Sequence, residues 1–167
     1  LMLDSFVADS PSDPAMLASA AELYALYGVM FVEDQERAAH LTEQARAYAA
    51  QGLCAQNADS CGLDALAYAD YTEVLNALGK DDVSALFTYS QAWLAQIRAN
   101  SSEISALSKL PHAEAALRRA RALDPAFREG DVSHYLAILV TLRPPALGGR
   151  FDEGREHFER AIELSQG

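Results

Sequence analysis

The sequence has few basic residues and no long apolar run. Lysine and arginine together number 13 against 24 aspartates and glutamates, which gives a formal net charge of −11. A surface this acidic repels phosphate backbones and anionic membranes, so the composition argues against a nucleic-acid-binding protein. The longest apolar stretch, Tyr135 to Val140, is far shorter than the ~18 residues that indicate a membrane-spanning helix.

Residues with a branched β-carbon are also few, whereas alanine is abundant. Alanine is the strongest helix former, so the composition favours helices over strands. The chain of 167 residues is long enough to bury roughly 70% of its unfolded surface in one core. We therefore expect a single helical domain over residues 1–167.

Recognisable catalytic motifs are missing. The sequence contains no G-x-S-x-G, H-E-x-x-H, phosphate-binding loop or dinucleotide fingerprint. Its four histidines are scattered, and the pair Glu153 and His157, one helical turn apart, supplies only two of the ligands a zinc site needs. The sequence thus predicts a non-enzymatic protein with no metal and no cofactor.

Only two cysteines are present, Cys54 and Cys61, and six residues separate them. The intervening Gln, Asn, Asp and Ser residues indicate a loop between helices, short enough to bring both sulfurs together. A disulfide is our main prediction, and it would fit an oxidising compartment. Two free thiols and a metal or redox pair are the alternatives, although the C-x-x-C redox spacing is absent.

Helix start and stop signals recur along the whole chain. Asp13-Pro14 is typical of an N-cap followed by proline at the first helical position, and Gly79 to Asp82 is typical of a turn between helices. The prolines and glycines between Arg143 and Arg150 exclude a regular helix there. Helices are expected over residues 14–31, 34–49, 64–78, 83–97, 111–123, 131–142 and 152–165.

Several predicted helices share a spacing of small and large residues that is typical of the second helix of tetratricopeptide repeats. The full signature occurs at Ala113, Leu117, Ala120 and Pro125. Partial matches occur at Ala38, Thr42 and Ala45, at Ala85, Tyr89 and Ala92, and at Gly154, Phe158 and Ala161. These matches predict an all-α array of antiparallel helix pairs. Because their spacing is irregular, the tetratricopeptide-like repeats would be degenerate, and an unrelated helical bundle is the alternative.

The order of motifs in the C-terminal third resembles one known family. Leu123 to Gly130 leads into His134-Tyr135-Leu136, followed by Arg143 to Gly149 with its Pro-Pro and Gly-Gly pairs, and then by Arg155 to Ile162. This arrangement resembles the TatT family, the tetratricopeptide-like T-component of TRAP (tripartite ATP-independent periplasmic) transporters. The segment Ala20 to Tyr27 and the lone Trp93 also sit where that family places similar residues.

The resemblance implies a periplasmic protein, either secreted or lipid-anchored through an N-terminal segment that would precede Leu1. It implies the solute-binding P-component as partner, a homo-oligomer with a trimer as one option, and a channel or cavity for a small ligand, a hydrophobic one being favoured. The competing hypothesis is a generic repeat scaffold that binds an extended peptide or protein in its groove.

Ten residues are candidates for contact with a ligand or partner. Seven aromatic residues fall on predicted inward helix faces, where a cavity lined by their rings would suit a small amphipathic or apolar molecule, and plain core packing is the alternative. These residues are Tyr24, Tyr27, Tyr68, Tyr71, Tyr89, Trp93 and Tyr135. Neighbouring His134 is expected to pack between the last two helices. Arg143 and Arg150 flank Gly148-Gly149 before a helix, which suggests an anion site or simply a tight connection.

Overall fold

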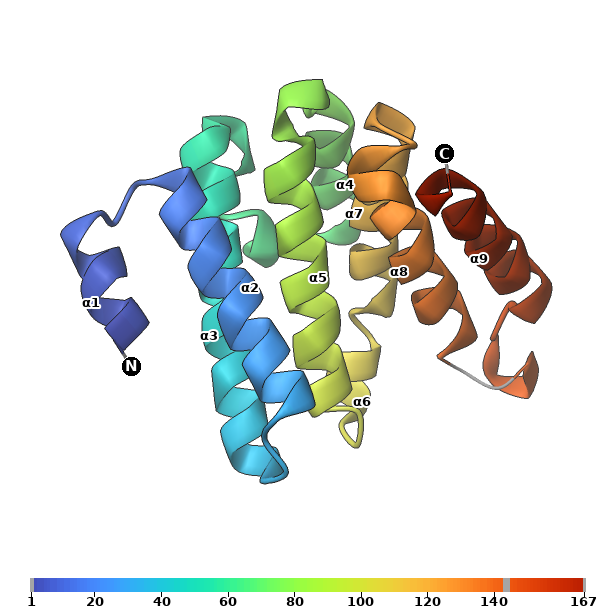
Figure 1. The fold of residues 1–167 in the computed structure, drawn as a ribbon, viewed down its shortest axis with the longest axis horizontal. Helices are drawn as coiled ribbons and strands as arrows, with labels where there is room; N and C mark the ends of the chain where they lie inside the picture. Colours follow the sequence, from blue (N-terminus) through green and yellow to red (C-terminus); the bar gives the residue numbers. More distant parts are fainter. Residues whose placement is uncertain (1, 143–144, 167) are drawn as a thin grey trace.

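The computed structural model describes residues 2–142 and 145–166, which form helices and no strand (Figure 1). The all-α prediction is therefore confirmed for the described part of the chain. The α-helices are α1 (Met2–Asp9), α2 (Pro14–Met30), α3 (Gln35–Gln56), α4 (Tyr68–Ala77), α5 (Val83–Ala99), α6 (Ile104–Leu107), α7 (Leu110–Leu123), α8 (Asp131–Thr141) and α9 (Phe151–Ser165).

The first two long helices begin at the predicted caps. The Asp13 carboxylate accepts hydrogen bonds from the backbone N–H groups of Ala15, at 2.9 Å, and Met16, at 3.2 Å. Asp34 accepts one from Arg37 N at 2.8 Å. These bonds satisfy N–H groups that have no partner within the helix, so the local sequence alone fixes both start points.

The predicted start of the third helix at Asp64 is wrong. Leu63–Ala65 forms a short 3-10 turn, and α4 begins only at Tyr68. The Asp64 carboxylate instead pairs with Arg46 at 3.0 Å and accepts a hydrogen bond from the Tyr89 hydroxyl. Because this side chain serves contacts to α3 and α5, it is not available to cap a helix of its own.

The helices stack side by side in a curved row (Figure 1). Helix α2 packs along α3, both pack on α5, α5 packs on α7, and α8 packs on α7 and α9. In the view of Figure 1, α2, α5 and α8 form the front layer, with α1 and α9 at the two ends. One continuous hydrophobic core runs through the row, and its largest fully buried side chains include Trp93, Tyr71, Tyr89, Phe87, Leu17, Leu53 and Leu117.

The repeat signature maps unevenly onto this row. Ala113, Leu117 and Ala120 on α7 are completely buried, as close helix packing requires. On α9, Gly154 is buried, but Phe158 remains 36% exposed because no further helix among the described residues covers it. The small-large-small spacing thus marks packed helix faces, while a repeat origin of the array stays a prediction.

The predicted disulfide is present. It joins Cys54, near the end of α3, to Cys61, which lies between two 3-10 turns, and the two Cα atoms are 4.5 Å apart. Neither sulfur is a free thiol. The bridge ties the loop that follows α3 back onto the helix.

Replacing both cysteines by serine should lower the free energy of unfolding by about 2.5 kcal/mol, because an uncrosslinked loop of this size gains conformational entropy in the unfolded chain. Urea unfolding of the oxidised protein and of C54S/C61S measures the difference. Adding a reductant should bring the wild-type protein to the level of the variant and leave the variant unchanged. Equal stabilities of the two proteins without reductant would contradict this account.

Candidate ligand-binding groove

A groove of about 600 Å³ runs between α2, α5 and α8, and we call it the α2–α5–α8 groove. Its lining side chains are mostly apolar. They include Ala21, Ala25, Leu26, Val29, Met30, Ala92, Leu94, Ala95, Ile97, Leu107, Leu110, Ile138 and Leu142. The polar and charged lining residues are Glu22, Thr88, Gln91, Arg98, Ser101, Arg128, His134 and Tyr135.

Small side chains create this space. Ala25 on α2 and Ala95 on α5 both line the groove. Larger side chains at these two positions would project into the groove and fill it. The size of the side chains that face a neighbouring helix decides how much space remains between packed helices. The abundant alanines, which favoured helices in the sequence, therefore also leave space for the groove between α2 and α5.

An ion pair crosses one end of the groove. Arg128, in the 3-10 turn Phe127–Gly130, pairs with Glu22 of α2 at 3.0 Å, and the Thr88 hydroxyl donates to the same carboxylate at 3.2 Å. The guanidinium of Arg128 also lies 5.7 Å from the ring centre of Phe87. We refer to Glu22 and Arg128 as the clasp. Sequence reasoning missed it, since its two members are 106 positions apart in the chain.

The backbone of the clasp is held in an unusual conformation. Arg128 and Glu129 have φ angles of 45° and 55°, in the left-handed region that residues with a side chain rarely adopt. Two consecutive residues of this kind persist only where surrounding contacts enforce them. Here the ion pair to α2 and the packing of the Phe127 ring on Phe87, at 5.4 Å between ring centres, supply those contacts.

Two of the predicted site residues line the groove. Tyr135 is half-buried and stands edge-on to Phe87, with 5.4 Å between ring centres, and burial raises the pKa of its hydroxyl, which therefore stays neutral. His134 is exposed, and its ring centre lies 5.6 Å from that of Phe158 on α9, so it contacts the last helix without the predicted packing between the last two helices. Beside Tyr135, the buried Gln91 Oε1 has no hydrogen-bond partner among the described residues.

Three further candidates form a buried cluster away from the groove. Trp93 packs edge-on against Tyr71 and Tyr89, with ring centres 5.8 Å and 5.4 Å away, and Arg46 lies 4.3 Å above its ring. The Tyr71 hydroxyl donates to the carbonyl oxygen of His112 at 3.0 Å. Burial raises the pKa of both tyrosines far above the ordinary value. These rings make up the core, the alternative that the sequence left open for them.

The remaining aromatic candidates lie elsewhere. Tyr24 is buried and, together with Tyr48 of α3, donates a hydrogen bond to Asp4, each at 2.7 Å, which fastens α1 to the row. The predicted inward orientation is wrong for Tyr27 and Tyr68, which are 42% and 48% exposed. Tyr27 follows Tyr24 by three residues and so points about 60° away from it around the helix.

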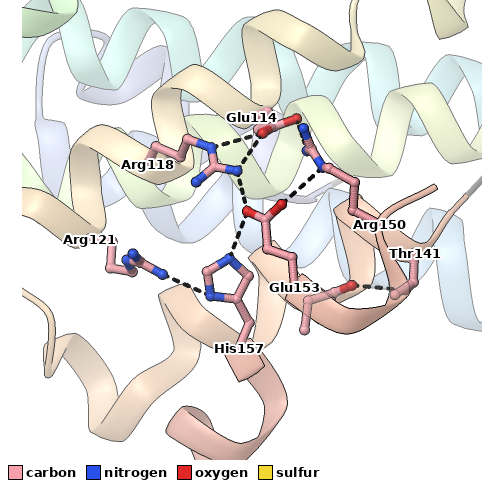
Figure 2. A network of polar contacts seen from close by, with 8 residues as sticks. Glu114, Arg118, Arg121, Thr141, Arg150, Glu153 and His157 are labelled. Carbon is pink, nitrogen blue, oxygen red and sulfur yellow. Dashed lines mark hydrogen bonds and ion pairs between the residues drawn. The ribbon is translucent and has the colours of Figure 1, made fainter. Parts of the chain in front are cut away.

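Arg150 belongs to an ionic network between α7 and α9 (Figure 2). Its guanidinium contacts Glu114 at 2.6 Å and Glu153 at 3.0 Å, and Arg118 contacts the same two carboxylates. Both carboxylates are therefore shared between two arginines, and Arg150 fastens α9 to α7 instead of standing free for an anion. Arg143 lies outside the described residues.

His157 completes this network and is buried (Figure 2). Its Nδ1 lies 2.8 Å from Arg121 Nη1, so Nδ1 must accept the hydrogen bond, and the proton of the neutral ring is on Nε2, 3.4 Å from Glu153. Burial lowers the pKa of this imidazole, and the charge of Arg121 lowers it further. Protonation of Nδ1 would place two donors face to face.

Mild acid should therefore destabilise the protein. In the unfolded chain the imidazole of His157 titrates near its ordinary pKa of about 6.5, while its folded pKa is lower. At a pH between the folded and the unfolded pKa of His157, the unfolded state binds more protons than the folded state. The stability that neutral His157 contributes is therefore fully present above its unfolded pKa and is lost as pH falls through its folded pKa. Urea unfolding at roughly pH 7.5 and pH 5.5 measures the loss.

The variant His157→Gln serves as the control, because glutamine keeps a polar side chain but does not titrate. Its stability should fall less than that of the wild type over the same interval. The pKa of His112 is also lowered, mainly by burial, so some of the acid sensitivity should remain in the variant. An equal loss in both proteins would show that His157 does not contribute.

Within residues 2–142 and 145–166, no group of three or more His, Cys, Asp or Glu side chains is placed to hold a metal ion. No helix in the same ranges is both long and apolar enough to cross a membrane.

Comparison with known proteins identifies the family. A search of curated proteins finds no match to this chain. The model of the family described as TAtT, the TRAP transporter T-component, matches residues 1–167, the whole chain. This family is a transporter accessory component and not a class of enzymes. On the strength of that match over its full length, the chain belongs to the TAtT family of TRAP transporter T-components.

Proposed function

We propose that this T-component works in the periplasm and binds a small hydrophobic ligand in the α2–α5–α8 groove. The observation that carries the proposal is the groove itself, which has about 600 Å³ of space and a mostly apolar lining. Ligand sites for small molecules are typically concave, apolar and of about 300–1,000 Å³, with a few polar groups that fix orientation. Gln91, Tyr135 and the clasp supply such groups.

Exposed apolar side chains at the mouth of the groove support the same conclusion. Leu26, Met30 and Leu142 are each more than 40% exposed, and all three line the groove. Exposed apolar surface that is gathered in one place is typical of binding sites. Covering it with an apolar ligand would contribute about 25 cal/mol for each Å² removed from water.

The generic scaffold hypothesis fits the groove less well. An extended peptide in the groove of a helical array runs along the concave surface and needs both ends open. Here the Glu22–Arg128 clasp crosses one end, where Thr88 also bonds to the carboxylate. An ion pair across the path that a polypeptide would follow favours a compact ligand over an extended peptide.

The partner and location follow from family membership as proposals. As a T-component, the protein should associate with the solute-binding P-component of its transporter, and a disulfide is consistent with the oxidising periplasm. Homo-oligomerisation and a lipid anchor belong to the same proposal. Calorimetry with the purified cognate P-component should detect a complex, and native mass spectrometry of the T-component should detect an oligomer.

A pair of leucines on α2 offers a matched test of the ligand site. Leu26 is 54% exposed and lines the groove, whereas Leu23 is 49% exposed and does not. Leu26→Asp should weaken binding of a neutral apolar probe, dodecanol, about tenfold, because a charged group would replace roughly 1.5 kcal/mol of apolar contact. Leu23→Asp should bind the probe as the wild type does. Equal affinities of the two variants would place the ligand elsewhere.

A further inference from the structure

We infer that the ligand of the α2–α5–α8 groove is an amphipathic monoanion of medium chain length, whose carboxylate binds Arg98 and whose apolar tail extends toward the clasp. This inference rests on the proposed function and adds to it the chemical class and the orientation of the ligand. Three observations support it: the balance of charges in the groove, the distance between its ends, and the chemistry of the wall between them.

The charges that line the groove are unequal at its two ends. At the clasp, Glu22 and Arg128 neutralise each other at 3.0 Å. At the opposite end, Arg98 in the last turn of α5 lines the groove and takes part in none of the ion pairs formed by the described residues. The groove thus presents one guanidinium whose charge no neighbouring carboxylate offsets, and a carboxylate is the group that matches its geometry.

The surroundings of Arg98 suit the head of an amphipathic molecule. Arg98 is exposed, so its guanidinium and a bound carboxylate would both keep part of their hydration. Ser101, three residues further along the chain and just beyond the end of α5, lines the same groove and can donate a second hydrogen bond. Met30 and Leu142, both exposed, line the groove as well and offer apolar surface next to the charged head.

The distance between the ends sets the chain length. Thr88, which bonds to the clasp, and Arg98 are ten residues apart on α5, a rise of about 15 Å along the helix. A C–C bond of about 1.5 Å advances an extended chain by ~1.3 Å, so roughly 12 carbons span that length. Dodecanoate is therefore the probe that matches the groove.

The wall between the ends excludes a second charge on the ligand. Between Arg98 and the clasp, α5 contributes Ala92, Leu94 and Ala95 to the lining, with Gln91 as its neutral polar member. A second carboxylate on the ligand would reach the clasp, where Arg128 is already paired with Glu22 and no cation is left for it. A carboxylate left without a cation there would be repelled by Glu22, and the net charge of −11 adds to the repulsion.

Calorimetric titrations with dodecanoate, dodecanol and dodecanedioate test the inference. The wild-type protein should bind dodecanoate about fivefold more tightly than dodecanol, the gain that a partly exposed ion pair of about 1 kcal/mol provides. It should bind dodecanedioate more weakly than dodecanoate. Arg98→Gln should remove the preference for dodecanoate over dodecanol and leave dodecanol affinity unchanged.

Arg37→Gln is the matched control for the loss of one positive charge. Arg37 is exposed on α3 and lies outside the lining of the groove. The substitution Arg37→Gln removes one positive charge, as Arg98→Gln does, so the preference for dodecanoate over dodecanol should persist in this variant. The outcomes separate the inference from the proposed function. If neither dodecanol nor dodecanoate binds, the hydrophobic groove itself is refuted. If both bind but wild type and Arg98→Gln show the same preference, the groove stands and the role of Arg98 is overturned.

Discussion

Replacing Trp93 by alanine should lower the free energy of unfolding by about 3–5 kcal/mol, the range typical of large aromatic side chains removed from a core. Trp93 is only 2% exposed. It stands at the centre of the cluster that joins α3, α4, α5 and α7, through Arg46, Tyr71, Tyr89 and His112 respectively. Its loss would leave a cavity in which these groups face one another across empty space.

Urea unfolding measures this loss of stability, and two further variants serve as comparisons. Trp93→Phe should cost much less than the alanine variant, since a ring still fills most of the site. Phe31→Ala removes an aromatic side chain that is 69% exposed and should leave stability almost unchanged. Because total stability of such domains is about 5–15 kcal/mol, Trp93→Ala should be close to unfolded at elevated temperature. A loss below about 1 kcal/mol would show that the cluster is loosely packed.

The second large effect is expected at Gly130, where α8 begins. Its φ of +99° suits glycine alone, and a Cβ atom there would lie 3.0 Å from the Cα and 3.1 Å from the carbonyl oxygen of Ala161 on α9. Backbone atoms of a helix cannot yield as a flexible side chain can. Gly130→Ala should therefore cost about 2–4 kcal/mol, from the strained backbone together with the forced separation of α8 and α9.

Gly148→Ala separates the two contributions. Gly148 also has a positive φ, +90°, but a Cβ there would meet no atom of the described part of the chain within 4 Å. This variant should cost only the backbone term of about 1–2 kcal/mol. Hydrogen exchange of the two variants provides a further readout, since Gly130→Ala should lose protection mainly in α9. Equal stability losses for both glycines would show that the contact with Ala161 does not matter.

Much of the fold could be predicted from local sequence. The caps Asp13 and Asp34 satisfy N–H groups within a few residues of themselves, so their positions are visible without any tertiary information. Asp64 shows the limit of this reasoning. It has the residue type of a cap, but its carboxylate bonds to Tyr89 and Arg46, which are distant in sequence, and the helix starts four residues later.

The candidate site was only partly predictable. The predicted set of inward-facing aromatic residues grouped Tyr135, which lines the groove, with Tyr71, Tyr89 and Trp93, which belong to the core. Aromatic residues on a helix look alike in sequence whether they line a groove or fill a core. What separates them is the distance between helices, which depends on the residues that face them from other helices.

Local sequence was enough to predict the helical class, the starts of two helices, the disulfide and, through its motifs, the family, because each depends on residues that are close together or on a recognisable order. The position of the groove, the ion pair of Glu22 with Arg128 across it, and the pairing of Arg150 but not of Arg98 became visible only in the folded structure. Those features depend on the packing of helices that are far apart in sequence, and side-chain charge acts only over the short distances that packing sets.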